Sequence, residues 1–175
     1  MLFGAYFFNK MIIFFDTETN GLPINYNAKV TDVKNWPRII QLGYIVTDLE
    51  GNTVKEFKRL IKPDGWLVPN LEFWKNNGYT QEQNESEGIA IKEALSEFIK
   101  DVNEAVLLVA HNLNFDHKIV GSEMVRLNLR ADQKPKFCTM ENTVDLVQLP
   151  GKFEGKFKWP KLEELHNFLF GEKFD

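Results

Sequence analysis

Residues 11–19 read MIIFFDTET, and the interpretation of the whole chain starts from this stretch. A short continuous apolar run is typical of a strand that is buried on both faces of a sheet. Asp16 and Glu18 follow at the end of the run, and residues two apart on an extended chain point to the same side. Two neighbouring carboxylates repel each other and favour a hard divalent cation such as Mg²⁺ or Mn²⁺. The same pair of carboxylates also occurs in solvated turns at strand ends. A second motif is therefore needed to distinguish a metal site from such a turn.

A second polar motif follows another apolar run. Residues 105–110 read AVLLVA, and residues 111–116 directly after them read HNLNFD. Asp116 falls in the first turn of the next predicted helix, where an acid also stabilises the helix dipole. Both apolar runs are expected at the centre of the sheet, which would make them neighbours. Asp116 is therefore predicted to be a third metal ligand, beside Asp16 and Glu18.

The segments around these two runs predict an α/β domain. Predicted strands lie at 11–15, 38–48, 53–61, 105–110 and 137–139, and predicted helices near 71–76, 91–102, 114–127, 140–147 and 162–170. The first three strands form an antiparallel meander, and Asn114 is predicted to cap the helix that follows it. The remainder of 66–88 is expected to be loop. The order implies a mixed five-stranded sheet with helices on both faces.

The composition is that of one globular domain. The 175 residues carry 21 Lys and Arg against 25 Asp and Glu, and the net charge of −4 excludes a strongly basic protein that coats nucleic acid. No apolar run is long enough to span a membrane, and the lone Cys138 predicts a reducing, cytoplasmic location. Because Met11 is a second candidate start, residues 1–10 are interpreted as an N-terminal extension ahead of a domain at 11–175.

With both motifs identified, the chain resembles the DEDD superfamily of 3′–5′ exonucleases, which have a ribonuclease H-like fold. It is most similar to the DnaQ-like proofreading subunit of DNA polymerase III and its stand-alone relatives. The family motif DxET is present at 16–19, HNxxFD at 111–116, and RIIQLG at 38–43 matches the usual second strand. The resemblance implies hydrolysis of DNA from the 3′ end with two divalent cations, Mg²⁺ or Mn²⁺, and release of nucleoside 5′-monophosphates.

The resemblance also implies roles for individual residues. Asp16 would bridge both ions, Glu18 would hold the ion that carries the attacking water, and Asp116 would support the other. Substrate contacts are expected from the motifs and the segments beside them, namely Thr17, Thr19, Asn20, Gly21, Leu22, Gln41, His111, Asn112 and Phe115. Gln41 stands where relatives usually carry an acid, so it keeps an acceptor and loses a charge.

The family's third motif is not found in these 175 residues. It carries a histidine general base and, five residues on, a fourth carboxylate, which in relatives follow a helix like the one predicted at 162–170. His166 lies on that helix, before the expected position, and is interpreted as a surface histidine. We therefore expect a domain that is incomplete at its C-terminus, lacks a final helix and has little or no activity. The open apolar surface also predicts a homodimer.

A basic and aromatic segment precedes the last predicted helix. Residues 151–162 carry four lysines against one acid, interleaved with three aromatic side chains. One interpretation is contact with a single strand through Lys156, Lys158 and Trp159. The other is a surface loop whose aromatic side chains attach it to the core. Both interpretations stay open.

Three functions also stay open. The first is a 3′–5′ exonuclease that acts on the 3′ end of single-stranded DNA, with a DNA polymerase as an implied partner. A nucleic-acid-binding module of the same fold without catalysis is the second. The third is an exoribonuclease, since the same carboxylates serve RNA and the contacts to the 2′-hydroxyl cannot be located in sequence.

Overall fold

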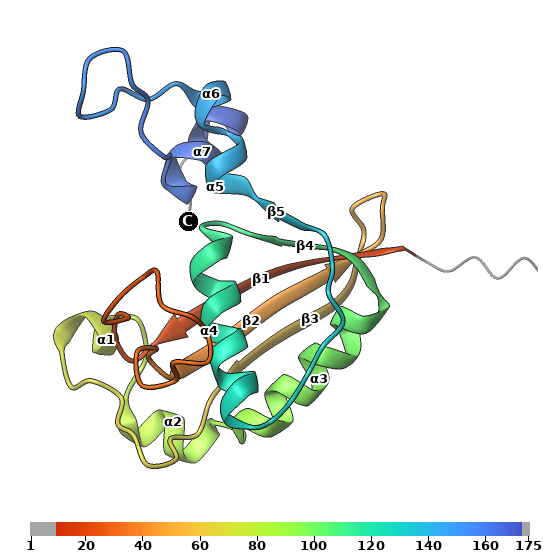
Figure 1. Ribbon diagram of the computed structural model, residues 1–175, viewed down its shortest axis with the longest axis vertical. Helices are drawn as coiled ribbons and strands as arrows, with labels where there is room; N and C mark the ends of the chain where they lie inside the picture. The colour runs from red at the N-terminus through yellow and green to blue at the C-terminus, as the bar shows by residue number, and fades with distance from the viewer. Residues whose placement is uncertain (1–9, 173–175) are drawn as a thin grey trace, which may run out of the picture.

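A mixed five-stranded sheet organises the chain, of which the computed structural model describes residues 10–172 (Figure 1). Its strands are β1 (Met11–Thr19), β2 (Ile39–Thr47), β3 (Thr53–Leu60), β4 (Ala105–Ala110) and β5 (Lys136–Cys138). They lie in the order β3-β2-β1-β4-β5, with β1 antiparallel to β2 and parallel to β4. The predicted meander is confirmed, and so is the adjacency of the two apolar strands.

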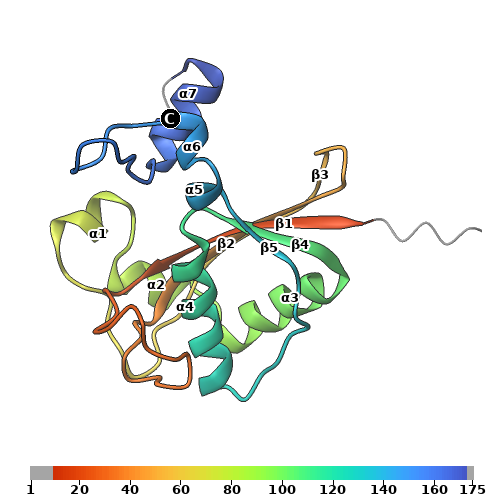
Figure 2. The same cartoon turned by 45° about the horizontal axis from the view of Figure 1, so that its top comes forward.

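The helices lie on both sides of this sheet. They are α1 (Glu72–Asn76), α2 (Gln81–Glu87), α3 (Ile91–Glu104), α4 (Leu113–Arg126), α5 (Thr139–Asn142), α6 (Val144–Val147) and α7 (Leu162–Phe170). In Figure 2, α3 and α4 lie below the sheet, whereas α5, α6 and α7 lie above it. This arrangement confirms the predicted α/β class with helices on both faces.

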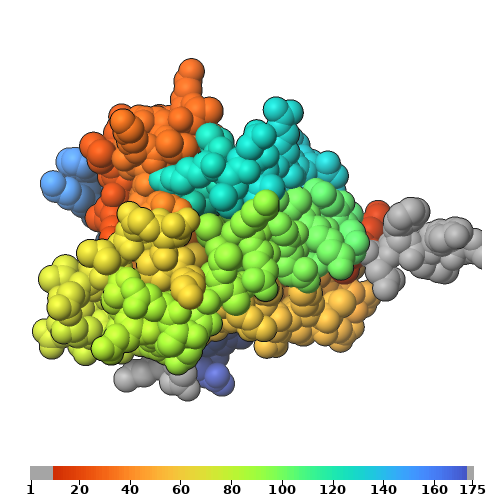
Figure 3. Space-filling model, turned by 90° about the horizontal axis from the view of Figure 1, so that it is seen from below, coloured from red at the N-terminus to blue at the C-terminus, as the bar shows by residue number. Residues whose placement is uncertain are grey.

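The face under α3 and α4 supplies the hydrophobic core, and Figure 3 shows these two helices side by side. Strand alternation turns Phe15 and Thr17 of β1 toward them, where both are buried. The ring of Phe15 packs against that of Phe98 in α3, with centroids 5.5 Å apart. Phe14 and Asp16 point the other way and are exposed. The first acidic motif therefore lies on the face opposite α3 and α4, which we call the open face because Phe14, Asp16 and Ile45 are exposed on it.

Two helix starts differ from prediction. Residues 81–87 form α2 instead of the expected loop, and the hydroxyl of Thr80 accepts a hydrogen bond from the Gln83 backbone N–H at 3.1 Å. Thr-x-x-Gln is a capping-box pattern, so the signal was present in the sequence. The prediction that Asn114 caps α4 is wrong. The cap residue is Asn112, in a left-handed conformation with φ of 63° and without a capping side-chain bond.

Two predictions concern the chain beyond its core. Residues 1–9 of the predicted extension lie outside the described residues, and the first strand begins at Met11, the candidate start. Between residues 10 and 172, no helix combines the length and the apolar character needed to cross a membrane.

Candidate active site

Two carboxylates lie at the end of β1 and a third at the start of α4. Asp16 and Glu18 lie on the open face of β1, and Asp116 is in the first turn of α4, where it is only 2% exposed. The backbone N–H and the hydroxyl of Thr17 both donate to Asp116 Oδ1, at 3.0 and 2.7 Å. These two hydrogen bonds to one oxygen fix the start of α4 against the end of β1.

Asp16 is the electrostatic centre of the three. Burial, and then the negative charge of Asp16, raise the pKa of Asp116 to about 7. Burial and the same charge also raise the pKa of Glu18, with Lys58 of β3 acting in the opposite direction. Partial burial of its carboxyl group raises the pKa of Asp16 itself. Mutual repulsion of this kind is relieved when a cation binds between the carboxylates.

The donors fit a hard divalent cation in their chemistry, because carboxylate oxygens are the ligands such ions prefer. The three carboxylates do not, however, converge on one point. In the part of the chain that the structure describes, no three Asp, Glu, His or Cys side chains lie close enough to hold one metal ion together. The three predicted ligands thus form no closed cage around a single point. Asp16 instead acts on Glu18 and on Asp116 separately.

The side chain of Thr17 is not placed for the predicted substrate contact. Its side chain points into the core, on the opposite face of β1 from Asp16 and Glu18, because successive strand residues alternate. Its hydroxyl is used by Asp116. Thr17 therefore orients a carboxylate instead of meeting a nucleotide.

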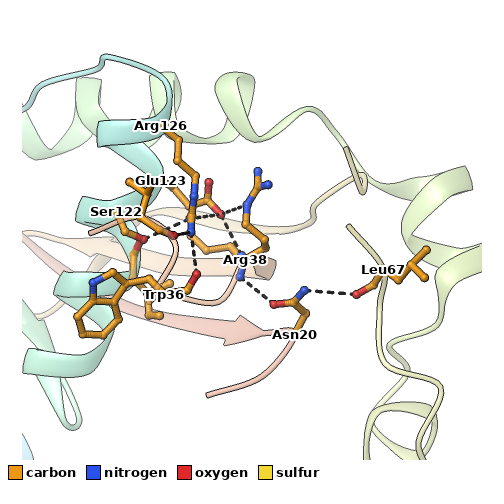
Figure 4. A network of polar contacts seen from close by, with 10 residues as sticks. Asn20, Trp36, Arg38, Leu67, Ser122, Glu123 and Arg126 are labelled. Carbon is orange, nitrogen blue, oxygen red and sulfur yellow. Dashed lines mark hydrogen bonds and ion pairs between the residues drawn. The ribbon is translucent and has the colours of Figure 1, made fainter. Parts of the chain in front are cut away.

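The loop after β1 is held by its own polar groups. The Thr19 hydroxyl donates to the Gly21 carbonyl at 2.7 Å. Asn20 Oδ1 accepts from the Arg38 backbone N–H at 2.8 Å, and its Nδ2 donates to the Leu67 carbonyl at 3.3 Å (Figure 4). Leu22, in contrast, is 73% exposed. Within this predicted substrate segment, Thr19 and Asn20 build the loop, and Leu22 offers free apolar surface.

A buried ion-pair network lies next to the same loop (Figure 4). Glu123 of α4 is 1% exposed, and its Oε1 lies 2.7 Å from Arg38 Nε and 3.1 Å from Arg126 Nη1. Arg126 Nη2 also donates to the carbonyls of Val33 and Trp36. The network ties the β1–β2 connection to α4. Sequence reasoning missed Glu123, because nothing in its neighbours distinguishes it from a surface acid on a helix.

The segment between β3 and α2 borders the site on another side. The Tyr79 hydroxyl donates to Gln41 Oε1 at 3.4 Å, and Trp74 Nε1 donates to the Thr19 carbonyl at 3.1 Å. Burial, followed by the charges of Glu18 and Asp16, raises the pKa of Tyr79 to about 12. Tyr79 is therefore a neutral hydroxyl near the carboxylates. No local sequence signal identified it, because its place depends on how residues 66–80 fold.

The side chains of the second motif, residues 111–116, mostly contact other parts of the protein. His111 Nδ1 lies 3.0 Å from Thr139 Oγ1, and its Nε2 lies 3.0 Å from the Pro160 carbonyl. Both ring nitrogens are thus used within the protein, which favours a structural role over the predicted substrate contact. Asn112 is exposed, and Phe115 is half-buried against the ring of Tyr26, with centroids 6.4 Å apart.

The basic segment before α7 is partly as predicted. Lys156 and Trp159 are exposed, but Lys158 Nζ is paired with Glu164 at 2.5 Å, so its charge is already compensated. The interpretation that the aromatic side chains attach this segment to the core is wrong, because all three are exposed. His166 is half-buried, with its ring 4.8 Å from that of Phe170.

A mixed sheet in the order β3-β2-β1-β4-β5, with helices on both sides, is the arrangement of a ribonuclease H-like fold. The chain belongs to the exonuclease family named RNase T, whose profile matches residues 13–167 and so includes all three carboxylates. The match confirms the resemblance inferred from the two motifs.

Individual relatives agree with this family. The chain is 33% identical over 112 residues to DNA polymerase III subunit epsilon of Treponema pallidum (strain Nichols), covering 63% of this chain and 44% of that protein. It also resembles E. coli exonuclease I in complex with a dA16 oligonucleotide, with a TM-score of 0.67 at 16% identity over 95% of this chain and 37% of that one. A product-bound exonuclease I gives a TM-score of 0.66 at 16% identity, over 91% and 38%. The chain thus spans less than half of each of these proteins, and the structural likeness shows the fold.

Proposed function

We propose that this chain carries the carboxylate centre of a metal-dependent 3′–5′ exonuclease that hydrolyses phosphodiester bonds of single-stranded DNA and releases nucleoside 5′-monophosphates. The observation that carries the proposal is that Thr17, which lies between Asp16 and Glu18 in β1, holds Asp116 at the same place through hydrogen bonds of 3.0 and 2.7 Å. Membership of the exonuclease family supports it. DNA is favoured over RNA because the relatives are a DNA polymerase subunit and a nuclease bound to a deoxyoligonucleotide.

Each residue then has a distinct part. Two divalent cations, Mg²⁺ or Mn²⁺, supply an activated water and stabilise the charge on the leaving oxygen when they are bound. Asp16 would contribute to both ion sites, Glu18 to one and Asp116 to the other, while Thr17 keeps Asp116 in its orientation. Leu22 provides exposed apolar surface for the terminal base. Tyr79 remains protonated, and its hydroxyl could exchange the 3.4 Å bond to Gln41 for a hydrogen bond to a phosphate oxygen.

We also propose that the polypeptide of residues 1–175 is a slow enzyme. A general base contributes about 10²–10⁴-fold to such a reaction. His111 has both ring nitrogens bonded within the protein. His117 lies on α4, and His166 lies on α7 with its ring 4.8 Å from that of Phe170. We therefore expect hydrolysis by the described residues to proceed without a positioned histidine base.

The test is release of mononucleotides from a 3′-labelled single strand in Mn²⁺ or Mg²⁺. We expect slow, metal-dependent release that Asp16→Asn abolishes and that Glu104→Gln, an exposed acid at the end of α3, leaves unchanged. Release by Asp16→Asn would contradict the proposed centre. Turnover that is already fast in residues 1–175 would contradict the need for a further base.

The same assay distinguishes the exonuclease from the two other functions that the sequence left open. Faster hydrolysis of a matched RNA strand would favour an exoribonuclease, and binding without any hydrolysis would favour a binding module. A DNA polymerase as partner rests on the Treponema relative alone, and a cytoplasmic location rests on that relative and on the lone Cys138. The homodimer stays a prediction, which analytical ultracentrifugation tests.

A further inference from the structure

A hairpin joins α6 to α7 and projects at the end of the molecule that α5–α7 occupy (Figure 1). The Gly151 N–H donates to the Lys156 carbonyl at 2.7 Å, and the Lys158 N–H donates to the Leu149 carbonyl at 3.0 Å. A Cβ on Gly151 would lie 2.6 Å from the Lys156 carbonyl oxygen, so the two arms approach too closely for any side chain there. Gly155 makes the turn with φ of 71°. Backbone bonds define the shape of this segment, the 149–159 hairpin.

The 149–159 hairpin presents its aromatic side chains to solvent. Phe153 is 70% exposed, Trp159 is 63% exposed, and Phe157 is also exposed. Burial of these rings would stabilise the fold, so their exposure on a defined hairpin requires another reason. Flat rings held at fixed positions are the feature on which unpaired bases stack.

The unpaired side chains of the hairpin carry a small positive excess, since two lysines, Lys152 and Lys156, stand against one exposed acid, Glu154. Lys158 pairs with Glu164 and Lys161 with Glu163, so both are compensated. Lys152 and Lys156 form no ion pair with any acid among the described residues; Lys152 instead lies over the ring of Phe153, 6.0 Å from its centroid. In a chain with a net charge of −4, two free lysines beside exposed rings favour a partner that is both polyanionic and aromatic.

The residues that directly follow the hairpin lie beside the carboxylate site. His111 contacts the Pro160 carbonyl directly after the hairpin, and the charge of Asp16 acts on the same imidazole. Leu162, at the start of α7, lines one groove together with Asp16 and His111. A chain that extends out of the site along this groove passes Leu162, three residues after the hairpin ends.

We propose that the 149–159 hairpin binds the single strand upstream of the 3′ end, with Lys152 and Lys156 on phosphates and Phe153 and Trp159 stacked on bases. The inference rests on the proposed function, because it uses the direction in which a strand leaves the carboxylates. It replaces Lys158 of the sequence prediction with Lys152, since Lys158 is already paired. A protein that docks on the same aromatic side chains is the competing outcome.

The first experiment measures affinity without hydrolysis. A fluorescein-labelled oligothymidylate of about 16 nucleotides is titrated with the 175-residue chain in EDTA, with anisotropy as the readout over a range of salt. We expect K152E/K156E to weaken binding at least tenfold and to reduce the salt slope by about 1.4, since each phosphate contact contributes about 0.7 on single strands. The matched control K92E/K100E changes the same charge on exposed positions of α3 and should alter affinity less than twofold.

A second experiment tests stacking. Trp159 is the most exposed of the tryptophans, so the oligonucleotide should quench the fluorescence of the wild-type chain, and Trp159→Phe should lose most of this quenching while affinity changes less than threefold. F153A/W159A should bind at least tenfold more weakly. The inference is overturned if the wild type does not bind, or if both K152E/K156E and F153A/W159A bind normally; normal binding would leave the exposed rings to a protein partner.

Separate measurements test the proposed carboxylate centre and the proposed strand-binding hairpin, so each can be contradicted without the other. Mn²⁺-dependent release from a dinucleotide, too short to reach the hairpin, should persist in K152E/K156E and disappear in Asp16→Asn. Normal strand binding by the hairpin variants with loss of hydrolysis in Asp16→Asn would overturn only the hairpin. Weak strand binding by those variants with unchanged hydrolysis in Asp16→Asn would overturn only the proposed centre.

Discussion

The two faces of the sheet contain similar residues in alternation, yet they differ in what those residues do. On the face covered by α3 and α4, Phe15 and Val46 are almost fully buried. On the open face, Phe14 of β1 is paired across strands with Ile45 of β2, and both are more than 40% exposed. Hydrophobicity alone therefore does not locate the core. The pleat assigns each position to packing or to the surface from which Asp16 projects.

The largest expected difference is between two adjacent phenylalanines. Phe15→Ala should reduce the free energy of unfolding by about 3–5 kcal/mol, because it removes a buried ring that packs on Phe98. Phe14→Ala removes the same atoms from the open face and should cost less than about 1 kcal/mol. Urea unfolding of both variants measures the comparison. Equal losses would mean that another part of the protein covers the open face.

Substitutions in the ion-pair network of Glu123, Arg38 and Arg126 test how strongly the face covered by α3 and α4 stabilises the loop beside the carboxylates. Glu123→Gln should lower the free energy of unfolding by about 2 kcal/mol, because Arg38 and Arg126 lose their buried counter-charge while the amide still accepts a hydrogen bond. Glu97→Gln removes an exposed partner of Lys55 and should cost less than about 0.5 kcal/mol. Denaturant unfolding and limited proteolysis of the 20–38 loop report the two effects. A loop that stays fully protected in Glu123→Gln would contradict the supporting role.

Asp116 connects the two faces of the sheet. It is buried on the covered face, and its carboxylate interacts with the charge of Asp16 on the open face. Its pKa of about 7 in the folded, metal-free chain lies above the ordinary 3.8, so the folded state binds a proton that the unfolded state has already released. Stability in EDTA should therefore fall as the pH rises from about 4 to 7 and remain low above that range. Asp116→Asn should weaken this dependence and raise stability at pH 8 by about 1–2 kcal/mol.

Thermal unfolding in EDTA at pH 5 and pH 8 measures this prediction. Asp16 and Glu18 have raised pKa values for related reasons, so part of the pH dependence should persist in the variant. Asp48→Asn is the matched control, because hydrogen bonds from Asn52 lower the pKa of that exposed carboxyl. A variant with the same pH dependence as the wild type would show that Asp116 is ionised throughout.

Sequence reasoning succeeded where neighbours along the chain determine the structure. The apolar runs of β1 and β4 predicted two central strands, and their adjacency brought Asp116 to the end of β1. The capping signal of α2 was also local and was overlooked. For each of these features, the residues that decide the outcome lie within a few positions of one another.

The rest depended on contacts between distant segments. Tyr79 reaches Gln41 only because residues 66–80 fold back over the end of β1 and β2. Lys158 looked like a free cation until α7 placed Glu164 beside it. The face of β1 on which Thr17 points followed from alternation, but its bond to Asp116 required the three-dimensional position of α4. Pair contacts of this kind have no periodicity that a sequence displays.

The smallest expected effect returns to the open face with a polar substitution. Ile45→Thr keeps a β-branched side chain in the strand and exchanges exposed apolar surface for a hydroxyl that water can solvate, so the free energy of unfolding should change by less than about 0.5 kcal/mol. Val46→Thr, one position along, buries that hydroxyl and should cost about 1–3 kcal/mol. Urea unfolding at two protein concentrations measures both. If Ile45→Thr proved as costly as Val46→Thr, or if its cost grew with concentration, a second molecule covering the open face would explain it, and the contrast between the faces would apply only to the monomer.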